Sequence, residues 1–120
     1  MIKGIGCDIV EIKRVEKIIA SGSGLVEKFL SGIELERFND MSENRQKEYL
    51  AGRLAAKEAY YKAKGTGICS LEDFGKVEIC SLLGRPTLQC EGEVDRVHVS
   101  ISHDNENAIA YVIIESVEEA

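Results

Sequence analysis

The chain has 120 residues, of which 44% are hydrophobic and 30% charged, and its formal net charge is −6. This length and composition predict a single globular domain, residues 1–120, which can bury a core without disulfide bonds. The acidic balance argues against non-specific nucleic-acid binding, which needs a basic surface, and no apolar run approaches the length of a membrane span. We therefore expect neither nucleic acid nor membrane as a partner.

The first residues, MIKGIGCDIVEIKRV, lack the long apolar stretch and the cleavage site of a signal peptide, so the expected location is cytoplasmic. The cysteines form no C-x-x-C pair and have no histidine at zinc-site spacing. They are Cys7, Cys69, Cys80 and Cys90. We expect them to be buried, reduced thiols that pack as small hydrophobic side chains.

Residues 1–12 are rich in β-branched side chains and predict a strand that carries one carboxylate, Asp8. Strand alternation places Asp8 on a face with Gly4, Gly6 and Val10, while Ile5, Cys7 and Ile9 face the other way. A carboxylate in such surroundings is costly to bury unless its charge is balanced. Three interpretations stay open for Asp8: a cap for the helix beginning near Lys13, a buried hydrogen-bonded carboxylate, or a metal ligand.

Helical patterns follow this strand. Residues 13–21 have apolar side chains at helical spacing and stop near Gly22, and two short helical pieces lie near 25–30 and 34–39. The clearest helix is ENRQKEYLAGRLAAKEAYYKAKG, residues 43–65, with Ser42 as a simple N-cap and Gly65 as its C-terminal signal. A row of alanines in this helix, Ala51, Ala55 and Ala59, would let another backbone approach closely.

The last third of the chain changes to strand periodicity, in KVEICSLL, PTLQCEG, RVHVSIS and NAIAYVIIE. A turn at Gly84–Arg85 is expected to join the first two of these strands in a hairpin. Helices first and strands last predict an α+β fold, in which a mostly antiparallel sheet packs with one long helix and several shorter helices.

Three local motifs each allow an ordinary and a functional interpretation. Glu58 and Lys62 are spaced as an exposed helical ion pair, yet Glu58 stands in AAKEAYY, which suits a partly buried surface. SISHD contains serine, histidine and aspartate but no G-x-S-x-G, so His103 is either a strand-end residue bonded to the backbone or a phosphate contact. KAKGTGI is a helix end whose free amides and lysines could also cradle an anion.

Three segments in this order, GIGCDIVEIKRV, YLAGRLAAKEAYYKAKGTGI and HVSISHDNENAIAYVIIE, resemble the short, single-domain bacterial 4′-phosphopantetheinyl transferases of the holo-acyl-carrier-protein synthase family. The resemblance covers essentially the whole chain. It implies transfer of 4′-phosphopantetheine from coenzyme A to a serine hydroxyl of apo acyl carrier protein, with adenosine 3′,5′-bisphosphate as the other product. It also implies a role in fatty acid biosynthesis and the 4′-phosphopantetheinyl transferase-like fold. Cys7 departs from the family pattern, which more often has threonine or an aliphatic residue there.

The resemblance also implies the site residues. The magnesium ligands would be Asp8 and Glu58, with Mn²⁺ chemically close to Mg²⁺, and a cation there would balance the charge on Asp8. Lys62 would be a third catalytic residue and would face the coenzyme A pyrophosphate. Arg53 and His103 would contact the 3′-phosphate, and Gly65 and Gly67 would let the backbone pass close to the nucleotide.

Two partners are implied in the same way. The acidic carrier protein would dock on the basic side of the first helix, formed by Lys13, Arg14 and Lys17, although an ordinary solvated helix face has the same pattern. The family is typically homotrimeric, with active sites between subunits. Two other functions use the same residues: a magnesium-dependent hydrolase of phosphoanhydrides, and a nucleotide-binding or assembly module without catalysis.

Overall fold

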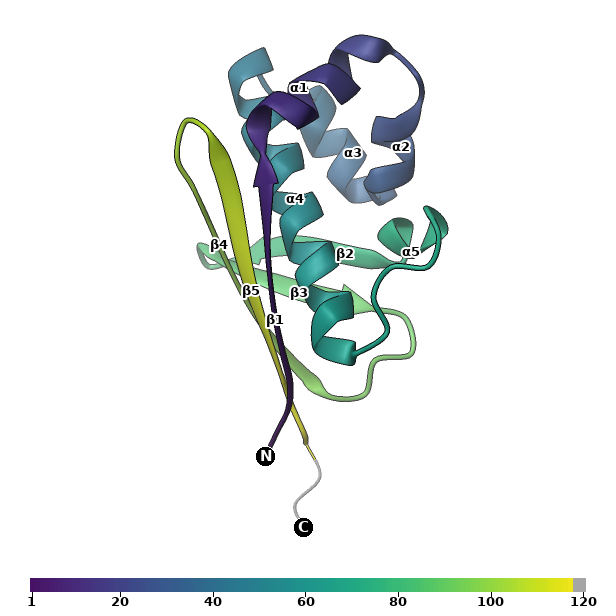
Figure 1. Cartoon of the computed structure of the whole chain (residues 1–120), viewed down its shortest axis with the longest axis vertical. Coiled ribbons are helices and arrows are strands. Elements are labelled where there is room, and N and C mark those ends of the chain that lie inside the picture. Colours follow the sequence, from purple (N-terminus) through teal and green to yellow (C-terminus); the bar gives the residue numbers. More distant parts are fainter. Residues whose placement is uncertain (118–120) are drawn as a thin grey trace.

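A 22-residue helix, α4 (Glu43–Lys64), runs along the long axis of the molecule (Figure 1). The computed structural model describes residues 1–117. The shorter helices are α1 (Ile12–Ser21), α2 (Leu25–Phe29), α3 (Gly32–Asn39) and α5 (Glu72–Gly75). The strands are β1 (Ile2–Glu11), β2 (Val77–Leu82), β3 (Arg85–Cys90), β4 (Arg96–His103) and β5 (Asn107–Glu115).

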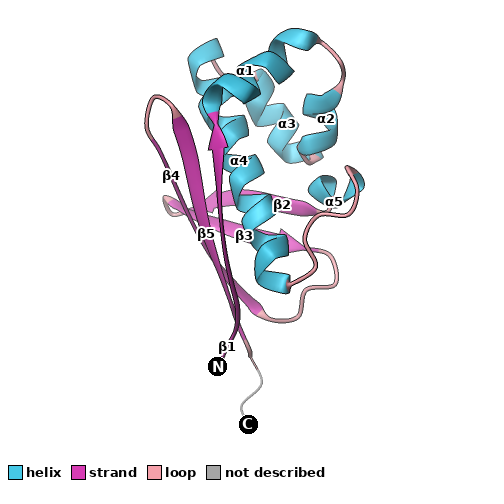
Figure 2. Cartoon of the chain, viewed as in Figure 1, coloured by secondary structure: helices cyan, strands magenta, loops and turns pink. Residues whose placement is uncertain are grey.

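The strands form two antiparallel sheets (Figure 2). One sheet has the order β1-β5-β4, and α4 packs against β1 and β5. The other sheet is the β2–β3 hairpin. Its strand β2 contacts α3 and α5, and its strand β3 contacts β4 of the first sheet. The predicted α+β class, with a mostly antiparallel sheet and one long helix, is confirmed. None of the helices described is both long and apolar enough to span a bilayer.

Two glycines of β1 let this strand cross α4 at the distance of backbone contact. A Cβ atom on Gly6 would overlap the carbonyl oxygen of Ala59, and one on Gly4 would overlap that of Ala63. The predicted close approach over the alanine row is therefore confirmed at Ala59, and it continues to Ala63. Because β1 and α4 are fixed this closely, side chains between them have little freedom to shift.

The ends of α4 are those that the sequence predicts. The side chain of Ser42 accepts a hydrogen bond from the backbone N–H of Arg45 at 3.4 Å, without a capping box. Gly65 ends the helix with a φ of 83°, a left-handed conformation that glycine adopts without steric cost.

Three local predictions need correction. The β2–β3 turn consists of Leu83 and Gly84, because Arg85 already pairs with Leu82 as the first residue of β3. Helix α3 begins at Gly32, not near Glu34, since Ser31 and Glu34 form a capping box. The short helix α5 was not predicted at all.

The prediction of four buried cysteines is also wrong. All four are free thiols, but Cys7 and Cys69 are exposed and Cys80 and Cys90 are partly buried. Cys7 lies on the outer face of β1, where strand alternation exposes it. Cys69 lies between α4 and α5, outside any strand or helix.

Candidate active site

Asp8 projects from the inner face of β1, where its side chain is 11% exposed. The predicted face is confirmed, because Gly6 and Val10 are buried while Ile5, Cys7 and Ile9 are exposed. Asp8 does not cap α1, whose N-cap position is Glu11. The capping interpretation is therefore wrong, and a buried carboxylate or a metal ligand remains.

Lys62, near the C-terminal end of α4, reaches across to Asp8. Its Nζ lies 2.9 Å from Asp8 Oδ1 and also donates to the carbonyl oxygen of Cys7 at 3.2 Å. The hydrogen bond and the negative charge of Asp8 raise the pKa of the Lys62 ammonium. An isolated helix would pair Lys62 with Glu58, four residues earlier. Within residues 1–117, Lys62 instead forms its ion pair with Asp8.

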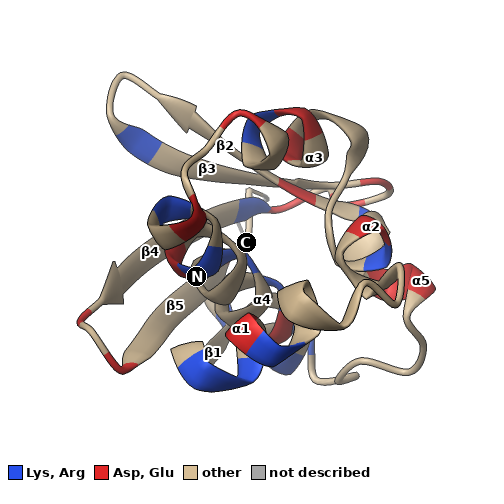
Figure 3. Ribbon diagram, turned by 90° about the horizontal axis from the view of Figure 1, so that it is seen from above, with Lys and Arg blue, Asp and Glu red and all other residues tan. Residues whose placement is uncertain are grey.

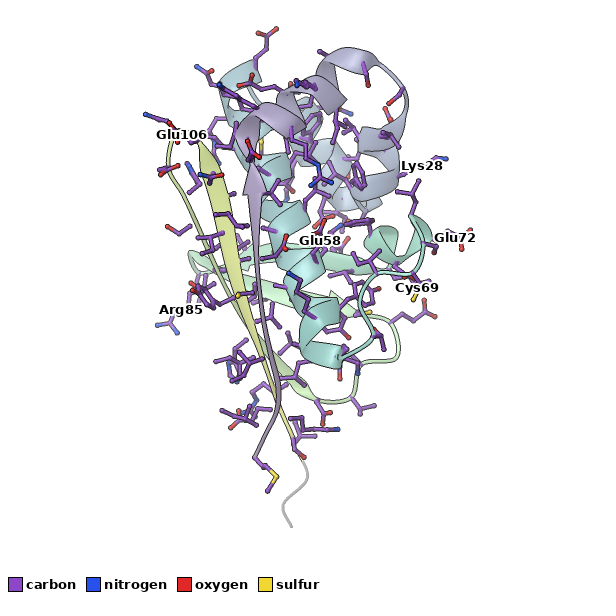
Figure 4. All side chains as sticks on the ribbon, in the orientation of Figure 1. Lys28, Glu58, Cys69, Glu72, Arg85 and Glu106 are labelled. Carbon is purple, nitrogen blue, oxygen red and sulfur yellow. The ribbon has the colours of Figure 1, made fainter. Side chains whose placement is uncertain are left out.

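Glu58 lies on the side of α4 that faces β1 (Figure 4). Burial raises its pKa to about 7, and the neighbouring Asp8 carboxylate acts in the same direction. Arg14 and Lys62 oppose this shift. The two carboxyl groups therefore meet in a partly buried place where ionising both is unfavourable, and a cation bound by both would favour their ionised forms.

The second carboxylate oxygen of Asp8, Oδ2, is buried and has no hydrogen-bond partner among the described residues. An unpartnered buried oxygen beside a second carboxyl group is a feature that a hard divalent cation would satisfy. No group of three or more His, Cys, Asp or Glu side chains gathers for a metal within residues 1–117. Mg²⁺ commonly takes one or two carboxylates and fills its other positions with substrate phosphate oxygens and water, so the donor set fits Mg²⁺ or Mn²⁺.

Arg53 lies on α4 but not beside Asp8. Its guanidinium stacks over the ring of Tyr49, 4.1 Å from the ring centre, and its Nε is buried without a partner among the described residues. At 3.6 residues per turn, Arg53 and Glu58 project about 140° apart around the helix. One chain alone therefore does not bring Arg53 to the Asp8–Glu58 pair.

His103, at the end of β4, lies even farther from the Asp8–Glu58 pair than Arg53 does. Its Nδ1 lies 3.4 Å from Glu48 Oε2, and Glu48 precedes Glu58 by about 15 Å along the axis of α4. Nδ1 also approaches the carbonyl oxygen of Asp104 at 3.4 Å, as the strand-end interpretation predicts. Asp104 accepts hydrogen bonds from the amides of Glu106 and Asn107, both 2.8 Å long, which lower its pKa. Asp104 thus orders the turn after β4 and does not orient His103 for a hydrolytic triad.

The glycine turn after α4 is not a ready-made anion cradle. The amide of Gly65 donates to the carbonyl oxygen of Lys62, and the amides of Thr66 and Gly67 donate to that of Tyr61. The prediction of free amides in KAKGTGI is therefore wrong, because the helix end uses them. Gly65 and Gly67 both have positive φ, and the space beside each is open, so their predicted contact with a nucleotide stays a prediction.

The predicted basic patch of Lys13, Arg14 and Lys17 is exposed on α1 (Figure 3). A groove of about 550 Å³ lies between the start of α1 and the β4–β5 turn. It is lined by Ile9, Glu11, Lys13, Arg14, Asn105, Glu106 and Asn107. Since Arg14 also lowers the pKa of Glu58, the patch reaches the edge of the carboxylate pair.

A second buried charge pair escaped the sequence analysis. Lys57 and Glu34 are both fully buried, with Lys57 Nζ 2.6 Å from Glu34 Oε1. Lys57 also donates to the carbonyl oxygens of Phe29 and Phe74, and Glu34 Oε2 accepts from the amide of Ile79. The pair joins α2, α3, α4, α5 and β2 immediately beside Glu58 in the chain. The S-x-x-E capping pattern at 31–34 was the available signal for Glu34.

Comparisons with known proteins show which family this chain resembles over nearly its whole length. A model of the 4′-phosphopantetheinyl transferase superfamily matches residues 4–113. A holo-[acyl-carrier-protein] synthase from Bacillus pumilus (strain SAFR-032) is 48% identical over 117 residues, covering 96% of this chain and 97% of that protein. Another, from Geobacillus sp. (strain WCH70), is 45% identical over 116 residues, with 96% and 98% covered.

Solved structures agree with these sequence matches. The holo-(acyl-carrier-protein) synthase from Bacillus anthracis str. Ames, in complex with CoA (3′,5′-ADP), is 42% identical. It superimposes with a TM-score of 0.88 and covers 97% of this chain and 98% of its own. The Helicobacter pylori protein in complex with coenzyme A is 32% identical, with a TM-score of 0.80 over 92% of this chain and 99% of that one.

Proposed function

The chain belongs to the 4′-phosphopantetheinyl transferase superfamily, and we infer that Asp8 and Glu58 hold the divalent cation that its reaction needs. The protein transfers 4′-phosphopantetheine from coenzyme A to a serine hydroxyl of apo acyl carrier protein. A bond forms between the serine oxygen and the β-phosphorus, and the bond from that phosphorus to the bridging oxygen breaks. The products are holo acyl carrier protein, adenosine 3′,5′-bisphosphate and the proton lost by the serine.

The unpartnered, buried Oδ2 of Asp8, in a carboxyl group that neighbours Glu58, is the observation that carries the cation proposal. The cation, Mg²⁺ or Mn²⁺, would supply charge neutralisation at the pyrophosphate as the serine oxygen attacks. Asp8 comes from β1 and Glu58 from α4, and the contact between Gly6 and Ala59 fixes the spacing of these elements. The two carboxylates are therefore preorganised, and the remaining cation positions are left for substrate oxygens and water.

The other site residues would act on the nucleotide. Lys62 has a half-exposed side chain that can turn from Asp8 to the pyrophosphate and stabilise the departing bisphosphate. Arg53 and His103 would bind the 3′-phosphate, and Gly65 with Gly67 would let the backbone lie along the nucleotide. The distance of His103 from the carboxylate pair supports a site shared between subunits, in which His103 of one chain serves coenzyme A bound to the next.

A homotrimer would supply such a shared site, and the outer face of the β1-β5-β4 sheet is suited to form it. Ile5, Ile9 and Tyr111 on this face are 64%, 61% and 53% exposed, and β5 adds the partly buried Ile109 and Ile113. Strand β4 contributes the polar His98, Ser100 and Ser102 to the same face. The apolar part of this face, on β1 and β5, is costly to leave in water. A monomeric mass by sedimentation equilibrium would contradict the proposal.

We further propose that the whole chain acts as one domain in the cytoplasm, in support of fatty acid biosynthesis. A single core cluster joins buried side chains from every helix and from strands of both sheets among the described residues. Four free thiols suit a reducing compartment. Export of a tagged chain in a cell-fractionation experiment would contradict the location.

Incubation of apo acyl carrier protein with coenzyme A, Mg²⁺ and this protein will add the mass of one phosphopantetheine group per carrier chain. Mass spectrometry of the carrier reports the product, and a chelator should stop the reaction because the cation is removed. Breakdown of coenzyme A without carrier would favour a phosphoanhydride hydrolase. Transfer at full rate in the chelator would remove the cation from the mechanism while leaving the transferase activity intact.

Charge reversal of the docking patch, Lys13→Glu with Lys17→Glu, is expected to raise the KM for carrier about tenfold or more and leave the KM for coenzyme A unchanged. The reason is that opposite charges steer the acidic carrier to α1, an effect that salt screens. Steady-state kinetics at low and high ionic strength measure both constants. Lys28→Glu, which reverses one charge on exposed α2, is the control for each single reversal, Lys13→Glu and Lys17→Glu, and an equal effect there would contradict a specific patch.

Cation affinity should fall as the pH drops below about 7, because Glu58 must lose its proton before it can bind a metal. The raised pKa also affects the stability of the metal-free fold, because the folded chain holds the Glu58 proton more tightly than the unfolded chain does. This stabilisation is fully present below about pH 4.5, the ordinary pKa, and is lost as the pH rises through about 7. Calorimetric titration with Mn²⁺ from pH 5.5 to 8 measures the affinity. A dissociation constant independent of pH over this range would contradict the assignment of Glu58.

A further inference from the structure

The Lys62 ammonium already occupies the carboxylate that the cation needs. Two acceptors surround it, Asp8 Oδ1 at 2.9 Å and the carbonyl oxygen of Cys7 at 3.2 Å. The Asp8 side chain is 11% exposed, whereas the Lys62 side chain is 54% exposed. A solvent-exposed cationic group is therefore paired with a largely buried carboxylate.

We propose that Lys62 is a built-in competitor of the divalent cation, which holds Asp8 until the cation and the coenzyme A pyrophosphate arrive. This inference rests on the proposed function of Asp8 and Glu58 as cation ligands. On loading, the Lys62 ammonium leaves Asp8 and pairs with the pyrophosphate instead. In this exchange Glu58 releases to solvent the proton that it carries at and below about pH 7, and no other covalent bond changes.

Two physical effects make Lys62 oppose cation binding. The ammonium uses one oxygen of Asp8 that a cation would share, and its positive charge lies within a few ångströms of any cation bound to that carboxylate. The Lys62 side chain can leave without being pulled from a buried place, because it is already 54% exposed, and the incoming cation takes over the charge of Asp8. Once it has left Asp8, the Lys62 ammonium attracts the anionic pyrophosphate of coenzyme A. Lys62 therefore weakens cation binding and strengthens coenzyme A binding.

The test is titration of the full-length protein with Mn²⁺ in the absence of coenzyme A, followed by electron paramagnetic resonance of the free ion. We expect Lys62→Met to bind Mn²⁺ about three- to thirtyfold more tightly than the wild type, because both the competition and the charge repulsion are lost. The same variant should show a KM for coenzyme A raised about tenfold. Lys64→Met, which removes the same charge two positions later in α4 and breaks a pair with Glu93, is the matched control and should leave Mn²⁺ affinity within about twofold.

The outcomes separate this inference from the function on which it rests. If the wild type binds Mn²⁺ and Lys62→Met binds it equally or more weakly, the competitor role is overturned and the cation site stands. If Lys64→Met tightens Mn²⁺ binding as much as Lys62→Met does, the effect is one of net charge and the inference is again overturned. If the wild type binds no Mn²⁺ with or without coenzyme A, the cation proposal itself fails.

Discussion

Replacing Asp8 with asparagine or Glu58 with glutamine will lower the rate of phosphopantetheine transfer by about a thousandfold or more, with the fold retained. Each substitution keeps the size of the side chain but removes the negative charge that a hard divalent cation requires, and cation stabilisation of a phosphoryl transition state is a large effect. Glu58→Gln also removes the conflict between two carboxyl groups, so its thermal midpoint should equal or exceed that of the wild type.

The measurement is the initial rate of carrier modification by mass spectrometry, at saturating coenzyme A and several Mg²⁺ concentrations. Glu43→Gln, which removes an exposed carboxylate at the start of the same helix, is the control and should keep the wild-type rate. A rate within about tenfold of the wild type for either Asp8→Asn or Glu58→Gln would remove that residue from the mechanism.

Replacing Lys57 with methionine will lower the free energy of unfolding by about 3–5 kcal/mol, the cost of breaking a buried ion pair by removing one partner. The substitution leaves the Glu34 carboxylate buried without its cation, and the carbonyl oxygens of Phe29 and Phe74 lose their donor. For a chain of this length the thermal midpoint should fall by about 10–20 °C.

Calorimetry and urea denaturation measure this loss. Lys28→Met on exposed α2 is the control and should change stability by no more than about 0.5 kcal/mol. The double variant Lys57→Met with Glu34→Gln should be more stable than the sum of the single effects predicts, because no charge then remains unpaired. A loss below about 1 kcal/mol for Lys57→Met would show that the pair contributes little to the fold.

Local patterns predicted the elements that hold the site. The alternation around Asp8 and the glycines beside it predicted the inner face of β1, and the signals at Ser42 and Gly65 predicted both ends of α4. These patterns suffice because strand alternation and helix capping depend on neighbours within a few residues.

What the sequence did not predict depends on contacts between distant residues. Lys57 looks like any lysine on a helix, and only the fold brings it to Glu34 and to two buried carbonyl groups. In the same way Lys62 pairs with Asp8 across the β1–α4 contact, although Glu58 is its neighbour on the helix. The amides of the glycine turn looked free because the sequence does not show which helix carbonyls they satisfy.

The proposed homotrimer could not be predicted from local patterns either, because it depends on contacts between chains. Arg53 was predicted from resemblance alone and His103 as one of two interpretations of SISHD, and in one chain neither lies beside the carboxylate pair. The exposed isoleucines of β1 alternate as in any two-sided strand, and only their pairing with isoleucines of β5 indicates a covered face.

The central claim is that two carboxylates, one from β1 and one from α4, clasp a divalent cation. Crystals grown with Mn²⁺ and measured near the manganese absorption edge test it most directly. We predict an anomalous difference peak between Asp8 and Glu58 that is absent from crystals of the Glu58→Gln variant. A wild-type map without a peak at that place, in crystals that hold coenzyme A, would contradict the claim.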